Sequence, residues 1–188
     1  EIKAVAGNVT ALDTEALIVN LFEGVTQPIG VTGAVDAALD GAVTRLISQG
    51  EIKGKKAEFT LIHTLGKLPT DRIIVAGLGR REQFSPEVIR QVMGSAVRFA
   101  RRLNVRNVAT IAHGAGVGGM DPATSGQAIT EGVILGLYTF RRYKSNVEDN
   151  VPREVEEVLI VEEDSDKVAF MQLGIDKGRL LAESTIIA

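Results

Sequence analysis

The chain has 188 residues, of which 45% are hydrophobic and 24% charged, and a formal net charge of −3. These values are typical of one folded domain and exclude disordered or collagen-like chains, while the negative charge argues against nucleic-acid binding. Because cysteine is absent, disulfides, zinc–thiolate sites and cysteine nucleophiles are excluded. No apolar run is long enough to span a membrane and no signal-peptide pattern opens the chain, so we expect a cytoplasmic protein without membrane contact.

Short apolar runs predict the β-strands. Residues 2–6 alternate between apolar and polar positions, whereas residues 15–22 are apolar on both faces, as in the centre of a sheet. Other runs of the same kind predict strands over residues 59–63, 72–79, 108–112 and 158–161.

Apolar residues at helical spacing predict helices between several of these strands. We expect one helix over residues 31–50 with Thr32 as its cap, a second over residues 85–103 with Ser85 as its N-cap, and a third over residues 127–144. Helices that alternate with apolar strands predict an α/β fold: a three-layer α/β/α sandwich with a mixed, largely parallel sheet.

The end of the chain predicts a separate helical segment. Residues 167–173 and 176–188 both have helical spacing, with Gly174 between them, and the second run stops without a glycine, proline or charge. We therefore expect a domain over residues 1–164, followed by a linker segment over residues 165–188 that leads into a part of the protein outside this chain.

A glycine-rich stretch follows the predicted strand at residues 108–112. Gly114, Gly116 and Gly119 match the G-x-G-x-x-G pattern, in which backbone N–H groups approach a phosphate, and the stretch also contains His113 and Gly118. The acidic residue that completes the dinucleotide fingerprint does not follow at the usual spacing. These residues form our candidate phosphate or ligand loop, but a tight turn with a structural histidine fits the pattern better.

Other polar groups fit structural roles better than chemical ones. His63 lies within a strand pattern, the acidic residues between 162 and 166 lack the spacing of a calcium loop, and the arginine pairs at 80–81, 101–102 and 141–142 have no interleaved aromatic residues. From the residues alone we expect no catalytic residues, metal ligands or cofactor site in this chain.

Three stretches together resemble the N-terminal domain of the leucyl (cytosol) aminopeptidase family. RIIVAGLG at residues 72–79, with the helix after it, resembles the strand, Gly-Leu-Gly turn and helix of that family. EGVILGLYTFRRYKS at residues 131–145 is the most specific match, and GRLLAESTIIA at residues 178–188 is similar to the family's linker helix.

The resemblance implies a role for the chain within a larger enzyme. Members are two-metal exopeptidases, usually hexameric, that use zinc or manganese to release N-terminal residues from peptides. Their metal ligands and catalytic residues lie in a C-terminal domain, and none of those positions occurs here. The implied partners are therefore the chain's own C-terminal catalytic domain and further copies in a homo-oligomer, and the implied roles are oligomer assembly and control of access to the active site.

A second resemblance gives the alternative function. GNVTALDTEALIVN at residues 7–20 looks like the opening of a macro domain, and IAHGAGVGG at residues 111–119 looks like its second ligand loop. Macro domains bind ADP-ribose. The sequence differs from that pattern at Asn8, where an aspartate is expected, and in VNLFEG, which replaces an asparagine-rich run, so binding of ADP-ribose or another phosphate ligand ranks second.

Overall fold

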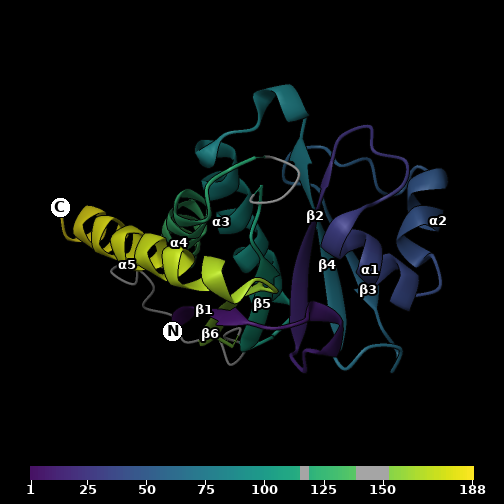
Figure 1. The fold of residues 1–188 in the computed structure, drawn as a ribbon, viewed down its shortest axis with the longest axis horizontal. Helices are drawn as coiled ribbons and strands as arrows, with labels where there is room; N and C mark the ends of the chain where they lie inside the picture. Colours follow the sequence, from purple (N-terminus) through teal and green to yellow (C-terminus); the bar gives the residue numbers. More distant parts are fainter. Residues whose placement is uncertain (115–118, 139–152) are drawn as a thin grey trace, which may run out of the picture.

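The computed structural model describes residues 1–114, 119–138 and 153–188. Two layers of helices enclose one sheet, in which the strands lie in the order β1-β6-β5-β2-β4-β3 (Figure 1). The strands are β1 (Ile2–Ala6), β2 (Ala16–Phe22), β3 (Phe59–His63), β4 (Arg72–Gly79), β5 (Asn107–Ile111) and β6 (Glu157–Glu162). The helices are α1 (Gly30–Ala38), α2 (Ala42–Ser48), α3 (Pro86–Arg102), α4 (Pro122–Leu137) and α5 (Ser165–Ile187), with short 3₁₀ turns η1 (Val9–Ala11) and η2 (Arg81–Gln83).

The sheet confirms the predicted fold class. The pairs β1–β6, β6–β5, β5–β2 and β2–β4 are parallel, and only the edge strand β3 runs antiparallel to its neighbour β4. β2 lies inside the sheet, as its apolar residues on both faces predict. Because the parallel strands all point the same way, the carboxyl ends of β2, β4, β5 and β6 meet at one edge.

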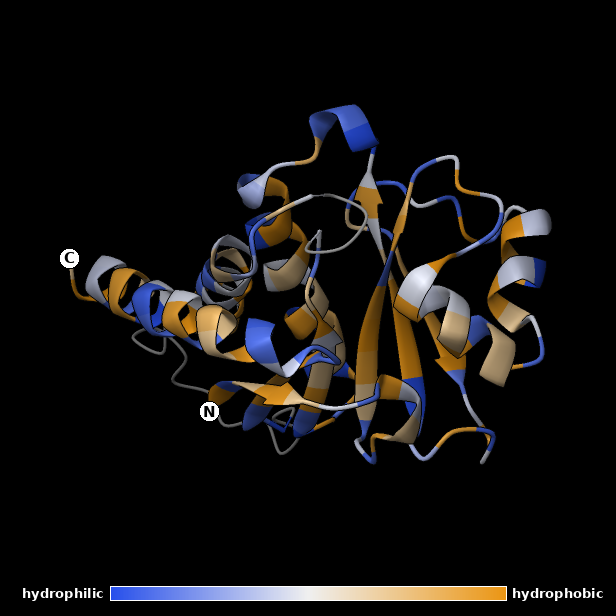
Figure 2. Ribbon diagram, viewed as in Figure 1, coloured by the Kyte–Doolittle hydropathy of each residue, from blue (hydrophilic) through white to orange (hydrophobic). Residues whose placement is uncertain are grey.

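Each face of the sheet has its own hydrophobic core. Leu17, Val19 and Leu21 of β2 pack with residues of α1 and α2, whereas Ile18 packs with residues of α3, α4 and α5. This alternation follows from the period of two along a strand. Figure 2 shows the apolar strands between the two helical layers.

The helix expected over residues 31–50 is wrong, because the chain forms two helices there. Asp40 (φ 55°) and Gly41 (φ 78°) adopt the left-handed conformation and separate α1 from α2. The predicted cap at Thr32 is also wrong, since α1 begins at Gly30 and the Thr32 hydroxyl donates to the carbonyl oxygen of Asn20 at 2.8 Å. The apolar period continues across the break, so it did not reveal the turn.

The helix starts on the other face of the sheet are set by N-caps. Ser85 accepts a hydrogen bond from the Val88 N–H, which confirms the predicted start of α3. α4 starts five residues before the predicted position 127, at Pro122, because the Asp121 carboxylate accepts hydrogen bonds from the Ala123 and Thr124 N–H groups. The predicted continuation of this helix from residue 139 to 144 lies outside the described residues.

The C-terminal segment is one helix of 23 residues, so the predicted interruption at Gly174 is wrong. Gly174 lies where α5 crosses α4, and a Cβ atom there would overlap the Ala123 carbonyl group. A Cβ atom at Gly178 would lie 2.6 Å from the Gln127 carbonyl oxygen. Both glycines therefore permit close packing of α5 on α4, which a sequence alone cannot distinguish from a break. The boundary at residue 164 stays a prediction.

Candidate functional site

A pocket of about 210 Å³ lies at the carboxyl edge of the sheet. It is formed by the ends of β2, β5 and β6 together with the start of α1 and the first turn of α5, which is the usual position of ligand sites in open α/β sheets. The residues that line it are Val9, Asn20, Phe22, Ile29, Gly30, Val31, Thr32, Ile111, Ala112, Gly114, Val161, Glu162, Glu163 and Lys167.

His113 lies behind the wall of this pocket and is completely buried. Its Nδ1 atom is 2.9 Å from the Asn20 amide nitrogen, and its Nε2 atom is 2.9 Å from the Thr110 hydroxyl and 3.0 Å from the Met93 sulfur. The Asn20 amide donates to Nδ1 in this orientation, so the ring proton is on Nε2. His113 thus links β2, β5 and α3 through its side chain.

Burial lowers the pKa of His113 to about 4. The imidazole is therefore neutral at physiological pH and has partners at both nitrogens, as expected of a structural histidine. Its main effect on the pocket is indirect, because it orients Asn20, which does line the pocket.

Gly114 provides the sharp turn after β5. Its φ is 78°, and its carbonyl oxygen accepts a hydrogen bond of 2.8 Å from the Met120 N–H, so the chain returns to α4 within a few residues. A Cβ atom at Gly114 would overlap the ring of Phe84, which packs edge-on against Phe22 at 5.1 Å. Gly119 also has a positive φ, of 65°, while Gly116 and Gly118 lie outside the described residues.

The first turn of α1 lines the pocket with Gly30, Val31 and Thr32. Among the described residues no side chain caps this helix, so its first N–H groups lack the partner that Ser85 gives to α3. A helix start of this kind favours anions. The charges around the pocket oppose that preference, because the carboxylates of Glu162 and Glu163 outnumber the single ammonium group of Lys167.

The remaining candidates are dispersed. His63 is exposed at the end of β3, and Asp164 caps α5 by accepting a hydrogen bond from the Asp166 N–H. Residues 101–102 end α3, whose 17 residues span about 25 Å at 1.5 Å per residue, whereas residues 80–81 lie before its start, where η2 begins. The pair at 141–142 lies outside the described residues.

In the described parts of the chain, no group of three or more His, Cys, Asp or Glu side chains is placed to hold a metal ion. Across the same residues, no helix has both the length and the apolar character needed to cross a membrane.

Sequence reasoning found Gly114 but missed most of the pocket. Asn20, Lys167 and the start of α1 come together only through the order of the strands. One signal was available: Asn20 is the single polar residue within an otherwise apolar central strand.

The fold is an α/β fold similar to that of solved macrodomains. A solved structure of the Trypanosoma brucei macrodomain in complex with ADP-ribose matches 91% of this chain and 67% of its own chain, with a TM-score of 0.70 and 15% identity. A mutant of tomato leucine aminopeptidase matches 98% of this chain and 36% of its own chain, with a TM-score of 0.76 and 19% identity. At these identities the likeness concerns the fold alone.

The sequence comparisons identify the family. The model of the N-terminal domain of the cytosol aminopeptidase family matches residues 18–147. A probable cytosol aminopeptidase from Alkaliphilus metalliredigens is 34% identical over 186 residues, which are 99% of this chain and 37% of that protein. The chain belongs to the cytosol aminopeptidase family and corresponds to its N-terminal domain; it spans little more than a third of such relatives.

Proposed function

We propose that this chain is the non-catalytic N-terminal domain of a metal-dependent leucyl aminopeptidase. The observation that carries the proposal is the match of residues 18–147 to the family's N-terminal domain, together with the 37% of a relative's length that the chain spans. The relatives' name, cytosol aminopeptidase, supports a cytoplasmic protein that removes N-terminal residues from peptides.

The donor groups of the described residues do not fit a pair of catalytic metals. The described residues offer no cluster of three metal-binding side chains, and the buried His113 uses both ring nitrogens in hydrogen bonds within the domain. We assign the two divalent metals, zinc or manganese, and the hydrolysis to the C-terminal domain, and derive no catalytic step from these residues. The domain's own roles are to help assemble a homo-oligomer, a hexamer, and to restrict access of peptides to the active site.

These roles can be tested on the full-length protein by deleting residues 1–164. We expect the deletion to reduce the mass of the assembly in sedimentation. It should also raise the relative kcat/KM for long peptides compared with leucine p-nitroanilide, because the restriction on access is removed. An unchanged mass and an unchanged preference for peptide length would contradict both roles.

Binding of ADP-ribose or another phosphate ligand is the second candidate function. It is supported by the macrodomain fold and by a pocket that joins Gly114 to the uncapped start of α1. This function ranks second for two reasons. The pocket volume of about 210 Å³ is below the usual volume of ligand pockets. The carboxylates of Glu162 and Glu163, which line the pocket, also repel phosphate.

Calorimetry with ADP-ribose separates the two candidates. The leading proposal predicts no heat of binding at millimolar ligand. Saturable heat that Lys167→Ala abolishes would support the ligand site, provided that Lys177→Ala, further along α5 and outside the pocket, retains it.

A further inference from the structure

The outer side of α5 carries a row of exposed apolar residues. Phe170, Leu173, Leu180 and Ile187 are 60%, 66%, 67% and 86% exposed, respectively. Lys177 and Ser184 complete the row, so that its members follow one another at alternating steps of three and four residues. This spacing places all six side chains on one stripe about 25 Å long, the pattern of a helix that packs against a partner.

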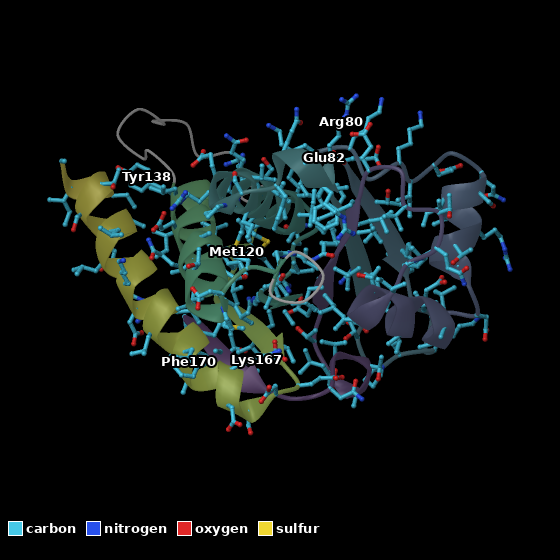
Figure 3. All side chains as sticks on the ribbon, turned by 45° about the horizontal axis from the view of Figure 1, so that its top comes forward. Arg80, Glu82, Met120, Tyr138, Lys167 and Phe170 are labelled. Atoms are coloured by element: carbon cyan, nitrogen blue, oxygen red, sulfur yellow. The ribbon has the colours of Figure 1, made fainter. Side chains whose placement is uncertain are left out.

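Two other sides of α5 contact the domain. Met171, Gly174 and Gly178 are buried against α4, and on another side Gln172 accepts a hydrogen bond of 3.0 Å from the Ala4 N–H. Arg179 donates to the carbonyl oxygen of Ile2 at 2.8 Å. The side chains of the outer row therefore do not belong to the hydrophobic core of this domain. In Figure 3 Phe170 lies on the outer side of α5, whereas Lys167 lies toward the middle of the molecule.

The charges on the helix limit the kind of surface that can cover this row. Lys177 lies in the middle of the row, is exposed, and makes no hydrogen bond or ion pair with the described residues. Covering the row without a partner for this ammonium group would bury an unpaired charge, which is costly. A matching surface therefore has an apolar groove with a carboxylate opposite Lys177.

We propose that the outer row of α5, residues 170, 173, 177, 180, 184 and 187, is the docking surface for the C-terminal domain of the same polypeptide. The inference rests on the proposed function. The matched family model describes an N-terminal domain, and the chain spans only 37% of a relative, so in such proteins a larger domain is tethered to this one. A tethered surface is present at millimolar effective concentration, which favours it over a second copy of this chain.

Cysteine labelling tests the docking surface directly, because residues 1–188 contain no cysteine. Leu173→Cys and Leu180→Cys would be made in the full-length protein and in residues 1–188. Ser48→Cys, exposed on α2 across the sheet, is the matched control. The rate of maleimide labelling at each introduced cysteine is read from the corresponding peptide by mass spectrometry.

We expect labelling at positions 173 and 180 to be at least tenfold slower in the full-length protein, with equal rates at position 48 in both proteins. Equal rates at all three positions would overturn the proposal. So would protection in residues 1–188 that increases with concentration, since the row would then bind a second copy. Hydrogen exchange of residues 177–187 in the unsubstituted proteins checks the result without any substitution.

Hydrolysis of leucine p-nitroanilide by the same full-length sample separates this inference from the proposed function. An active enzyme with rapid labelling at positions 173 and 180 would contradict the docking surface alone. An inactive full-length protein would contradict the proposed function.

Discussion

The two sides of α5 differ in what they pack against. On the inner side, Gly174 and Gly178 bring the helix into direct contact with the backbone of α4. On the outer side, Leu173 and Leu180 are two-thirds exposed. The inner side therefore contributes to the packing of this domain, whereas the side chains of Leu173 and Leu180 lie largely outside it. Small residues mark the contact of α5 within the domain, and the large exposed ones form the surface that we propose as a docking site.

The largest effect is expected from Gly174→Ala. The added methyl group would overlap the Ala123 carbonyl group, which belongs to helix backbone and cannot rotate away. We expect the free energy of unfolding to fall by about 3 kcal/mol, measured by urea denaturation of residues 1–188. The neighbouring Leu173→Ala, on the outer side, should change it by less than about 0.5 kcal/mol. Equal losses at the two positions would remove the distinction between the sides.

A second effect of similar size concerns the buried His113 and the dependence of stability on pH. Burial lowers its pKa to about 4 in the folded protein, from an ordinary value of 6.5. The unfolded chain therefore binds a proton more readily, and the domain loses stability as the pH falls from 6.5 towards 4. The total loss is about 3 kcal/mol at 1.36 kcal/mol per pKa unit.

Urea denaturation of residues 1–188 across this pH range measures the loss. His113→Gln should remove most of this pH dependence, although it also lowers stability at neutral pH by disturbing the contacts with Asn20 and Thr110. His63→Gln, at an exposed position, is the control and should keep the dependence of the wild type. A pH profile that His113→Gln leaves unchanged would show that the ring is not buried as described.

A moderate effect is expected where α3 meets α4. Arg90 pairs with Glu131, whose side chain is 10% exposed, and with Glu87, whose side chain is 62% exposed. The hydrogen bond from Arg90 to Glu131 raises the pKa of Arg90. We expect Glu131→Gln to lower the free energy of unfolding by about 2 kcal/mol, and Glu87→Gln by less than about 0.5 kcal/mol. Thermal denaturation of both variants compares the two losses of stability. A larger loss for Glu87→Gln than for Glu131→Gln would contradict the prediction.

The smallest effect is expected at the start of α3. Ser85→Ala removes the side chain that accepts from the Val88 N–H, so the loss should be about 1 kcal/mol in urea denaturation. Ser85→Asp keeps an acceptor at the cap and should recover most of that loss. If Ser85→Asp were as unstable as Ser85→Ala, the hydrogen bond at the cap would not be what stabilises the start of the helix.

Much of the fold was predictable because local patterns decide it. The buried run of β4 and the Ser85-Pro86 start of α3 each contain their own signal. The break at Asp40 and Gly41 was missed because the apolar period continues through it. Gly174 was misinterpreted because its neighbour in space, Ala123, lies far earlier in the chain.

The pocket was less predictable than the fold. Gly114 could be found from its glycine-rich surroundings, but Asn20 and Lys167 reach the same edge from β2 and α5. Only the order of the strands in the sheet brings these residues together, and local patterns in one sequence do not reveal that order. His113 belonged to the candidate ligand loop; the structure buries its ring and places Asn20 and Thr110 at hydrogen-bond distance from its two nitrogens.

The central claim is that this domain takes no part in the chemistry of its parent enzyme. Its most direct test is the hydrolysis of leucine p-nitroanilide by equal concentrations of residues 1–188 and the full-length protein, each with added manganese or zinc. We expect turnover by the full-length protein and none above background by residues 1–188. Metal-dependent turnover by residues 1–188 alone would contradict the claim.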